Sequence, residues 1–446
     1  MDIEEYARRS LKENKPQEEI IDKLTKIILY YKDIDEKKAK QLAQAVIKEV
    51  EITSTINTPL TDYYKTNIHM GKFGVGSRGK GDFYIHGKIA EIVKNTNSNA
   101  LVNPTAQDDG GVVKVDDTYY ITTAIDGIHS RLSDYPFLAG FHTARATLRD
   151  VCTMGANPVA ILSDIHLADD GDVSKLFDFT AGICAVSELT NVPLVAGSTL
   201  RIGGDMVLGS RLVGGVGAVG SSKTPPTARN NAQAGDVILM SEGCGGGTIT
   251  TTAIYNNYPE VIEKTLNVQF IKASQLLNNY ENIEDIHAMT DVTNGGLIGD
   301  CNEINKTTGL GIDLVYEKIK NLVDESVYEM LDSLDIDFLG VSIDSLMIIV
   351  KEDIKDDIIK LMEDNNIRCD EIGKITDTGK TFIEYEDKKE PLTPKFREAA
   401  YTPIKKVVDD IYDEDYEENT KIIDEATKSA INKKNMLVKK IMEKNE

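Results

Sequence analysis

Two patterns of hydrophobic residues divide the chain into expected strands and expected helices. Short runs rich in β-branched and aromatic residues predict strands at residues 112–115, 119–125, 160–165, 206–219, 237–241, 345–350 and 381–385. Apolar residues at helical spacing predict helices at residues 137–154, 173–189, 248–255, 268–279 and 297–305. Strands interleaved with helices are typical of an α/β (α+β) protein.

Amphipathic helices are expected at both ends of the chain. Residues 16–50 carry apolar residues at helical spacing between charged ones, which predicts two helices, and residues 404–446 repeat this pattern. The acidic run at residues 409–418 is typical of a solvated segment. These extra helices offer a surface for a protein partner.

A change in composition at residues 221–226 predicts a boundary between two domains. This segment reads Ser-Ser-Lys-Thr-Pro-Pro, and a new strand is expected after it. With 446 residues and 41% hydrophobic content the chain can bury two cores. The expected parts are an N-terminal helical extension (1–65), a first domain (66–225), a second domain (226–390) and a C-terminal helical extension (391–446).

Composition narrows the class of protein. A net charge of −23 opposes non-specific binding to nucleic acid or to an anionic membrane, because such partners need a basic surface. The five cysteines form no C-x-x-C pair and are expected to be free thiols. No apolar run approaches the ~20 residues of a membrane span, and the first residues lack a basic signal-peptide start. We therefore expect a cytoplasmic protein.

Aspartates in the first half of the chain suggest a metal site. Asp108 and Asp109 precede the first expected strand, Asp126 ends the second, and Asp150 lies inside the apolar helix that follows. Mg²⁺ prefers oxygen ligands and is usually held by a few carboxylates together with substrate phosphates. The pattern predicts a magnesium–nucleotide site. The plainer alternatives are a polar turn at Asp108 and Asp109, and a helix cap or a paired surface carboxylate at the other two positions.

Asp291, Thr293 and Asn294 form a similar polar group in the second half. They precede the helix expected from residue 297, so they either cap that helix or contact a substrate at its N-terminus. Both readings stay open. Asp116 and Asp117, between the first two expected strands, are interpreted as a hairpin turn.

Two glycine-rich segments complete the candidate chemistry. Residues 71–81 contain Lys72, Gly76, Arg78 and Lys80, which favours a mobile loop that contacts phosphates over a plain linker. Residues 243–248 read Gly-Cys-Gly-Gly-Gly-Thr and join a strand to a helix. A tight strand–helix turn is slightly favoured there over a phosphate-binding loop.

Ordered motifs in the chain resemble those of the superfamily that contains aminoimidazole ribonucleotide synthase, the PurM-like proteins. Its members include selenophosphate synthetase, thiamine-monophosphate kinase and the ATP-dependent dehydratase of hydrogenase maturation. The resemblance runs from about residue 71 to about residue 375 and is carried by four segments: Asp-Asp-Gly at 108–110, Ile-Asp-Gly-Ile at 125–128, Arg-Asp-Val at 149–151 with Met-Gly-Ala-Asn-Pro at 154–158, and Thr-Asp-Val-Thr-Asn-Gly-Gly-Leu at 290–297.

This resemblance implies a fold, a pair of cofactors and a set of roles. The implied fold has an N-terminal sheet that pairs with its copy in a homodimer to make a barrel-like core, followed by a C-terminal α/β domain. The implied cofactors are ATP and Mg²⁺, and relatives pass the γ-phosphoryl group to an oxygen of a small-molecule substrate. The implied roles are metal binding by Asp108, Asp109, Asp126 and Asp150; nucleotide binding by Lys72, Gly76, Lys80, Asp108, Asp109 and Asp150; catalysis by Asp126 and Lys80; and substrate binding by Asp291, Thr293 and Asn294.

Some positions depart from the family pattern. Residues 196–199 read Ala-Gly-Ser-Thr, so Ser198 stands where the family often has an acid. The loop at 71–81 lacks the cysteine of selenophosphate synthetases, and the C-terminal cysteine of the hydrogenase-maturation enzyme has no counterpart in residues 441–446. Roles like those of either relative stay as alternatives, as does a nucleotide-binding regulatory protein without catalysis.

Overall fold

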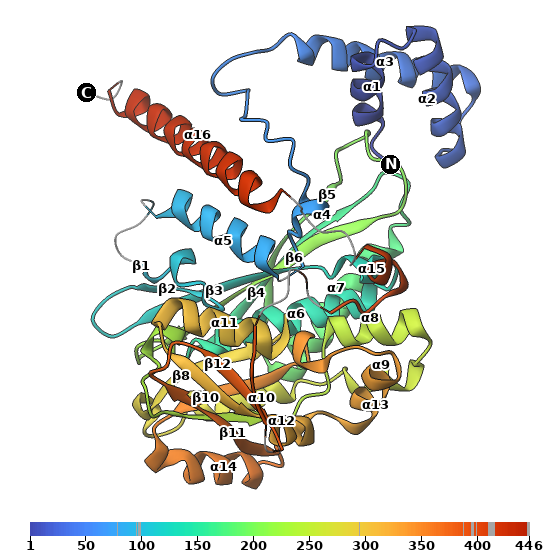
Figure 1. Cartoon of the computed structure of the whole chain (residues 1–446). Helices are drawn as coiled ribbons and strands as arrows, with labels where there is room; N and C mark the ends of the chain where they lie inside the picture. The colour runs from blue at the N-terminus through green and yellow to red at the C-terminus, as the bar shows by residue number, and fades with distance from the viewer. Residues whose placement is uncertain are drawn as a thin grey trace.

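The structure is a computed structural model that describes residues 1–77, 79–94, 96, 100–293, 295–386, 388–393, 397, 399–408 and 415–443. Two β-sheets form the centre of the molecule, and helices cover them and extend from both ends of the chain (Figure 1). This mixed α/β arrangement confirms the expected fold class. Within the described residues, no helix is long and apolar enough to cross a membrane.

The first sheet has strand order β1-β2-β3-β6-β4-β5. Its strands are β1 (Ala100–Val102), β2 (Gly111–Lys114), β3 (Tyr120–Gly127), β4 (Asn157–Leu167), β5 (Leu194–Arg201) and β6 (Leu212–Ser222). One face packs against α6 (Pro136–Thr153) and α7 (Ser174–Thr190) around a buried apolar cluster. A Cβ on Gly140 of α6 would lie 2.0 Å from the carbonyl oxygen of Phe179, so glycine is required for the close approach of these helices.

The other face of this sheet is open and partly apolar. Ile125 on β3, Leu162 on β4 and Val213 on β6 are all exposed. Ile125 and Leu162 both pair in register with Gly217, and Val213 lies on the same side of β6 two pleats away. Exposed apolar side chains therefore share one face of a sheet whose opposite face is buried.

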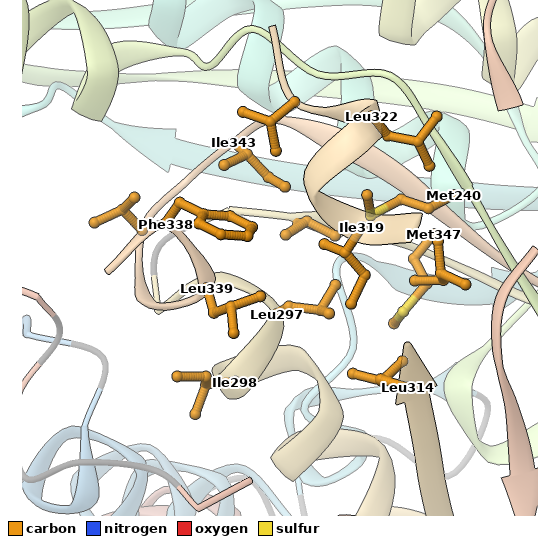
Figure 2. Packing of buried hydrophobic residues seen from close by; sticks show 14 of the residues in the cluster. Met240, Leu297, Ile298, Leu314, Ile319, Leu322, Phe338, Leu339, Ile343 and Met347 are labelled. Carbon is orange, nitrogen blue, oxygen red and sulfur yellow. The ribbon is translucent and has the colours of Figure 1, made fainter. Parts of the chain in front are cut away.

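The second sheet has strand order β13-β12-β9-β11-β7-β10-β8. Its strands are β7 (Val237–Ser241), β8 (Ile286–Val292), β9 (Gly311–Val315), β10 (Ser345–Val350), β11 (Cys369–Thr376), β12 (Thr381–Tyr385) and β13 (Lys388–Pro391). Every residue of β7, β8 and β10 is buried, because both faces are covered. Its larger core cluster includes Met240, Leu297, Leu314, Ile319 and Met347 (Figure 2).

Helices around the second sheet link it to the first. They are α8 (Gly247–Asn256), α9 (Pro259–Lys264), α10 (Gln269–Asn278), α11 (Gly296–Thr308), α12 (Tyr316–Leu322), α13 (Glu325–Ser333) and α14 (Lys355–Asp364). Among them α8 and α10 contact α6 of the first domain. Helix α6 therefore packs on both halves of the molecule, and its residues lie at their junction.

The ends of the chain form separate helical layers. Helices α1 (Ile3–Lys12), α2 (Gln17–Tyr31) and α3 (Glu36–Ser54) enclose a small apolar core that also takes in Leu208. At the other end, α15 (Pro403–Val408) is followed by the long α16 (Tyr416–Met442), which lies along α5 (Lys80–Val93) (Figure 1). The short helix α4 (Met70–Phe73) lies near the start of α5.

Most expected elements are confirmed, and the exceptions have local causes. The strand expected at 206–219 begins only at Leu212, because Gly203, Gly204 and Gly209 take positive φ and form a turn before it. The Asp116 turn is confirmed, since its Oδ1 accepts from the backbone N–H groups of Thr118 and Tyr119. All five cysteines are free thiols, as expected. The acidic run at 409–418 lies largely outside the described residues.

Candidate functional site

A cavity of about 1170 Å³ lies at the junction of the two domains. Its wall is built by the region before β2, the end of β3, helix α6, the end of β8 and helix α11, with Gly76 and α5 on another side. Cavities of roughly 300–1,000 Å³ hold typical small-molecule ligands. At about 1170 Å³ this cavity is at least as large as that range.

The structure brings the aspartates expected from the sequence to this one cavity. Asp108 and Asp109 lie just before β2, Asp126 near the end of β3, Asp150 on α6 and Asp291 at the end of β8, and all five line the wall. The backbone N–H of Asp291 donates to Oδ2 of Asp109 at 3.3 Å, which joins the two domains. The polar-turn and surface-carboxylate alternatives do not account for this convergence.

Arg229 organises one group of these acids. It lies in a short 3₁₀ helix (Arg229–Asn231) between the two sheets, and its side chain is 3% exposed. Its guanidinium contacts Asp109 and Glu303 at 2.6 Å each and Asp300 at 3.7 Å. Its backbone N–H donates to Oδ2 of Asp108 at 2.9 Å. A single buried arginine therefore holds both members of the aspartate pair against the second domain.

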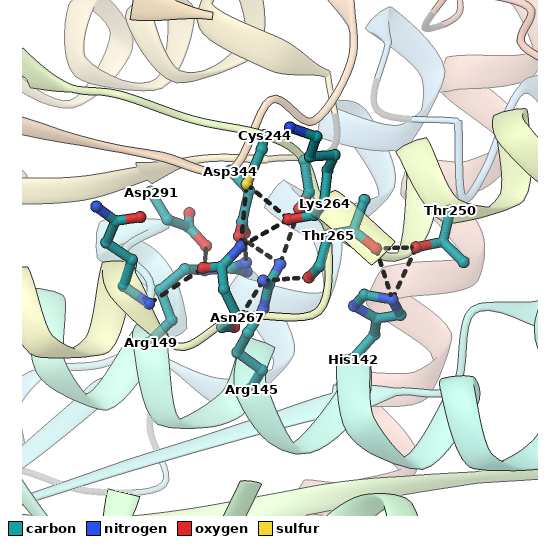
Figure 3. A network of polar contacts seen from close by, with 12 residues as sticks. His142, Arg145, Arg149, Cys244, Thr250, Lys264, Thr265, Asn267, Asp291 and Asp344 are labelled. Carbon is teal, nitrogen blue, oxygen red and sulfur yellow. Dashed lines mark hydrogen bonds and ion pairs between the residues drawn. The ribbon is translucent and has the colours of Figure 1, made fainter. Parts of the chain in front are cut away.

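Arg145 and Arg149 organise a second group, one turn apart on α6. Both guanidinium groups contact Asp344, a residue with positive φ just before β10 (Figure 3). Arg149 also contacts Asp291 and, at 3.4 Å, Asp150. The ion pairs with Asp344 and Asp291 cross from the first domain to the second, whereas the pair with Asp150 lies within α6.

Burial and nearby charges together shift the pKa values of these acids in different directions. Burial, with Asp291 and Asp108 nearby, raises the pKa of Asp109 to about 7 despite Arg229. Burial and the neighbouring Asp126 and Asp291 also raise the pKa of Asp150 well above its usual value. For Asp344 burial acts in the same sense, but Arg145 and Arg149 outweigh it and lower the pKa. The cavity thus holds more carboxylates than its arginines neutralise.

The oxygen atoms of the cavity fit a hard divalent cation. Oδ2 of Asp300 is buried and has no hydrogen-bond partner among the residues that the structure describes. Within the same residues, no three His, Cys, Asp or Glu side chains form a preformed metal-binding group. Mg²⁺ usually takes only one or two carboxylates and completes its shell with phosphate and water. The carboxylates that line the cavity match that donor set.

The glycine-rich loop expected at 71–81 comprises the end of α4, a connecting segment and the start of α5, and it meets the cavity through Gly76 but not through its lysines. Gly76 lines the wall, and its N–H donates to the buried Asp82 at 2.9 Å. Lys72 and Lys80 face the start of α16, where they lie 3.7 Å from Asp415 and 3.6 Å from Glu417. Arg78 lies outside the described residues. Contact of Lys72 and Lys80 with phosphate stays a prediction.

Asp291 and Thr293 do not cap the helix that follows them. Gly295 is the N-cap residue of α11, and no side-chain cap is present among the residues that the structure describes there. Asp291 instead pairs with Arg149, and Thr293 donates to Oδ1 of Asp291 at 3.3 Å. Asp291 and Thr293 line the cavity, whereas Asn294 lies outside the described residues. The capping alternative is therefore wrong for Asp291 and Thr293, and their substrate contact stays a prediction.

Several cavity residues were not expected from the sequence. Asp300 and Glu303 lie on the expected helix at helical spacing from Leu297. Their position on one side of that helix is the only feature of the sequence that could have indicated that they line the cavity. Arg229 lies in a polar segment between the domains, and nothing local marks it. The glycine cluster at 243–248 forms a strand–helix turn whose Gly246 and Gly247 line the cavity.

Comparison with protein families now decides the classification. Residues 107–220 match the N-terminal domain of AIR synthase related proteins, and residues 214–386 match the C-terminal domain of the same proteins. The chain belongs to the AIR synthase related family. Both matched regions contribute to the cavity, so the site is built from the parts that define this family.

Relatives within the AIR synthase related family include ATP-using enzymes. An uncharacterized protein of Methanocaldococcus jannaschii is 51% identical over 453 residues, which covers 100% of this chain and 99% of that protein. Thiamine-monophosphate kinase of the same organism is 26% identical and covers 58% of this chain and 82% of the kinase. Selenide, water dikinase of Clostridium botulinum is 26% identical and covers 56% and 74%.

Solved structures share the fold. The hydrogenase maturation protein HypE in complex with ATP matches with a TM-score of 0.55 at 18% identity, over 72% of this chain and 96% of HypE. ThiL in complex with AMPPCP and TMP matches with a TM-score of 0.54 at 17% identity, over 70% and 96%. This family member therefore has the PurM-like fold.

Proposed function

We propose that the chain is a Mg²⁺- and ATP-dependent enzyme that transfers the γ-phosphoryl group of ATP to an oxygen of a small-molecule substrate. The observation that carries the proposal is the convergence of Asp108, Asp109, Asp126 and Asp150 on one cavity at the domain junction. Relatives named as a kinase and as a dikinase, and a structural neighbour in complex with ATP, support the nucleotide.

The proposed division of roles follows the geometry of the cavity. Asp108, Asp109, Asp126 and Asp150 would hold Mg²⁺ and the nucleotide phosphates. Mg²⁺ would supply charge to the phosphoryl group and to the crowded carboxylates, which suits a reaction that depends on positioning and charge neutralisation. Asp126 would lie closest to the transferred group, and Asp291, Thr293 and Asn294 would face the substrate.

The glycine-rich loop would complete the site by moving. Gly76 already lines the cavity, while Lys72 and Lys80 point to α16. Lys72 and Lys80 would exchange these carboxylate partners for nucleotide phosphates, and Lys80 would then assist transfer. Phosphate carries more negative charge than a single carboxylate, so the exchange is favourable when the nucleotide is bound.

Binding and turnover measurements test the proposal. Mg²⁺ should strengthen ATP binding, and Asp109→Asn and Asp126→Asn should each weaken it by roughly 10-fold or more, as for loss of a charge-assisted contact. Asp178→Asn, at an exposed position on α7, is the matched control and should bind ATP normally. ADP release on screening with a metabolite panel would then reveal the substrate. Unchanged ATP affinity in both cavity variants would disprove the site.

A nucleotide-binding regulatory protein without turnover is the second candidate. It is favoured by the pairing of Lys72 and Lys80 with α16, since a protein that reports nucleotide binding needs a contact that the nucleotide can break. Tight Mg²⁺-dependent binding with no ADP release for any metabolite tested would support it over the enzyme.

A homodimer through the first sheet is part of the proposal. The open face of that sheet carries Ile125, Leu162 and Val213, and apolar side chains gathered on one sheet face are typical of an interface. Pairing of this face with its copy in a second chain would bury them.

A further inference from the structure

Arg149 is a buried cation at the centre of the acidic cavity. It projects from α6, lines the cavity wall, and its side chain is 9% exposed. Its three carboxylate neighbours come from both domains: Asp150 from the first, and Asp291 and Asp344 from the second. A buried arginine that contacts three carboxylates, with the Phe270 ring 5.7 Å from its guanidinium carbon as a further neighbour, has acidic surroundings like those that proteins give to a metal ion.

Arg145, one turn earlier on the same helix, differs in what its donors bind. Its guanidinium donates to the carbonyl oxygens of Thr265, Asn267 and Gly245 at 2.8, 3.0 and 3.0 Å, as well as to Asp344. Backbone carbonyls cannot be displaced by a ligand without unfolding the loops that carry them. Arg145 therefore stabilises the junction of the domains, and few of its N–H groups remain to bind a ligand.

Arg149 keeps hydrogen-bond donors in reserve. A guanidinium carries five N–H donors. Among the residues that the structure describes, Arg149 donates one hydrogen bond to Asp344 at 2.5 Å and a long one to Asp150 at 3.4 Å, and its Nε forms an ion pair with Asp291 without hydrogen-bond geometry. The remaining N–H groups belong to a side chain that lines the cavity. An oxyanion in the cavity beside Arg149 would meet a charged, planar group that can donate hydrogen bonds to it.

We infer that Arg149 takes the place of one divalent cation in this site: it neutralises Asp150 and Asp291 and gives its remaining N–H groups to the terminal phosphate of the nucleotide. The inference rests on the proposed function, which it deepens. A guanidinium matches the oxygens of a phosphate in a bidentate manner and stays charged at all working pH values. With Arg149 in place, the site would bind one Mg²⁺ fewer than it would if a metal ion neutralised Asp150 and Asp291.

Two variants and one control separate this role from a purely structural clamp. Arg149→Gln removes the charge, Arg149→Lys keeps the charge but loses the planar pair of donors, and Arg201→Gln is the control, because Arg201 is an exposed arginine that does not line the cavity. The first measurement is the ratio of the affinities for AMPPCP and AMP in the presence of Mg²⁺. Arg149→Gln should lower this ratio by roughly 10- to 100-fold, as for loss of hydrogen bonds to a charged group, and Arg149→Lys should lower it less. Arg201→Gln should leave the ratio unchanged.

The second measurement counts bound Mn²⁺ by electron paramagnetic resonance, without nucleotide. Arg149→Gln leaves Asp150 and Asp291 without their cation, so it should bind one Mn²⁺ more than the wild type, whereas Arg201→Gln should not. Equal loss of AMPPCP and AMP affinity together with an unchanged Mn²⁺ number would overturn the inference and leave Arg149 as a clamp. If the wild type binds neither nucleotide, the proposed function fails, and the Mn²⁺ number alone then supports or overturns the cation role.

Discussion

At the scale of single residues, buried charges at the domain junction set both stability and chemistry. Asp108, Asp109, Asp126 and Asp150 could be singled out from the sequence because each lies at or near an apolar strand or inside an apolar helix. Arg229 and Asp344 could not, because the former lies in a polar connecting segment and the latter in a loop with φ of 59°. Their roles depend on partners more than 100 residues away in sequence, for instance Asp109 for Arg229, with |i−j| of 120. Local sequence patterns cannot predict ion pairs between residues so far apart in the chain.

Asp344→Asn tests the value of the ion pairs. Asparagine tolerates positive φ, so the substitution removes the charge and leaves the backbone unstrained. Because Arg145 and Arg149 would lose the carboxylate they share, we expect the free energy of unfolding to fall by about 3–5 kcal/mol in urea denaturation. Asp134→Asn is the control, since Asp134 forms an exposed pair with Lys175 at 3.1 Å and should cost no more than about 1 kcal/mol. Equal losses in the two variants would contradict this view of Asp344.

His129 gives a prediction about pH. Burial, with Lys405 and Arg131 nearby, lowers the pKa of His129 to about 4, against 6.5 as its ordinary value. Below pH 6.5 the side chain of His129 becomes protonated in the unfolded chain, whereas in the folded chain it stays neutral until the pH approaches 4. The contribution of neutral His129 to stability is therefore complete above pH 6.5 and is lost as the pH falls to 4, by about 3 kcal/mol at most.

His129→Gln removes this titration. The gap between wild type and variant in free energy of unfolding should change between pH 7 and pH 4.5, with the wild type losing more stability on acidification. Urea denaturation at the two pH values measures the gap. A gap that stays constant would show that His129 titrates alike in the folded and unfolded chains.

At the scale of elements, the strands that were predicted best are those buried on both faces. The bounds of β7 and β10 agree with the expected strands, since apolar residues fill nearly all of both. The bounds of β12 agree as well, although only Ile383 is buried there. Strand β8 was missed, because His287, Thr290 and Asp291 interrupt its apolar residues. Those polar residues are buried because they bind Asp236, Arg229 and Arg149. The polar residues that make these buried contacts therefore interrupt the hydrophobic pattern by which the strand could have been predicted.

The contact between α16 and the glycine-rich loop provides a prediction at the same scale. Tyr416 stacks on Phe73 with ring centroids 5.2 Å apart, and the Lys80 ammonium lies 4.1 Å from the centre of the Tyr416 ring. Tyr416→Ala should release the loop and speed tryptic cleavage at Lys72 and Lys80 by roughly 2- to 10-fold, the value of an aromatic pair. Mg²⁺–ATP should slow cleavage again.

Tyr30→Ala is the control for this experiment. Tyr30 is 83% exposed on α2 and belongs to the N-terminal helices rather than to the loop. Its loss should leave the cleavage rate at Lys72 and Lys80 unchanged. Cleavage that is equally fast in wild type and Tyr416→Ala, with or without Mg²⁺–ATP, would argue against any hold of α16 on the loop.

At the scale of the whole molecule, two sheets in sequence order could be predicted, but the assembly could not. Periodicity marks which residues of a strand share a face, and it does not say what covers that face. Val213 is 40% exposed on the open face of the first sheet and does not line the cavity. Phe177 is 69% exposed on α7, which packs on the covered face.

These two positions make a matched test of the proposed homodimer. Val213→Glu should place buried charges at the interface and convert the dimer to monomer at micromolar concentration, whereas Phe177→Glu should leave it a dimer. Sedimentation velocity distinguishes the two states. A wild-type protein that sediments as a folded monomer would disprove the sheet-mediated dimer, and the terminal helices would then become the expected means of assembly.

The ion pairs across the domain junction also decide the path by which a ligand reaches the cavity. Moving the domains apart would break the ion pairs of Arg145 and Arg149 with Asp344 and Asp291. Breaking buried ion pairs requires too much free energy for a step that must occur each time a ligand enters. On another side, the wall formed by Gly76 and α5 is held through surface contacts with α16, such as Tyr84 with Asp424 at 2.6 Å. We therefore expect ligands to enter the cavity on the α5 side. The rate at which α16 is released from α5 should then limit the rates of nucleotide association and dissociation.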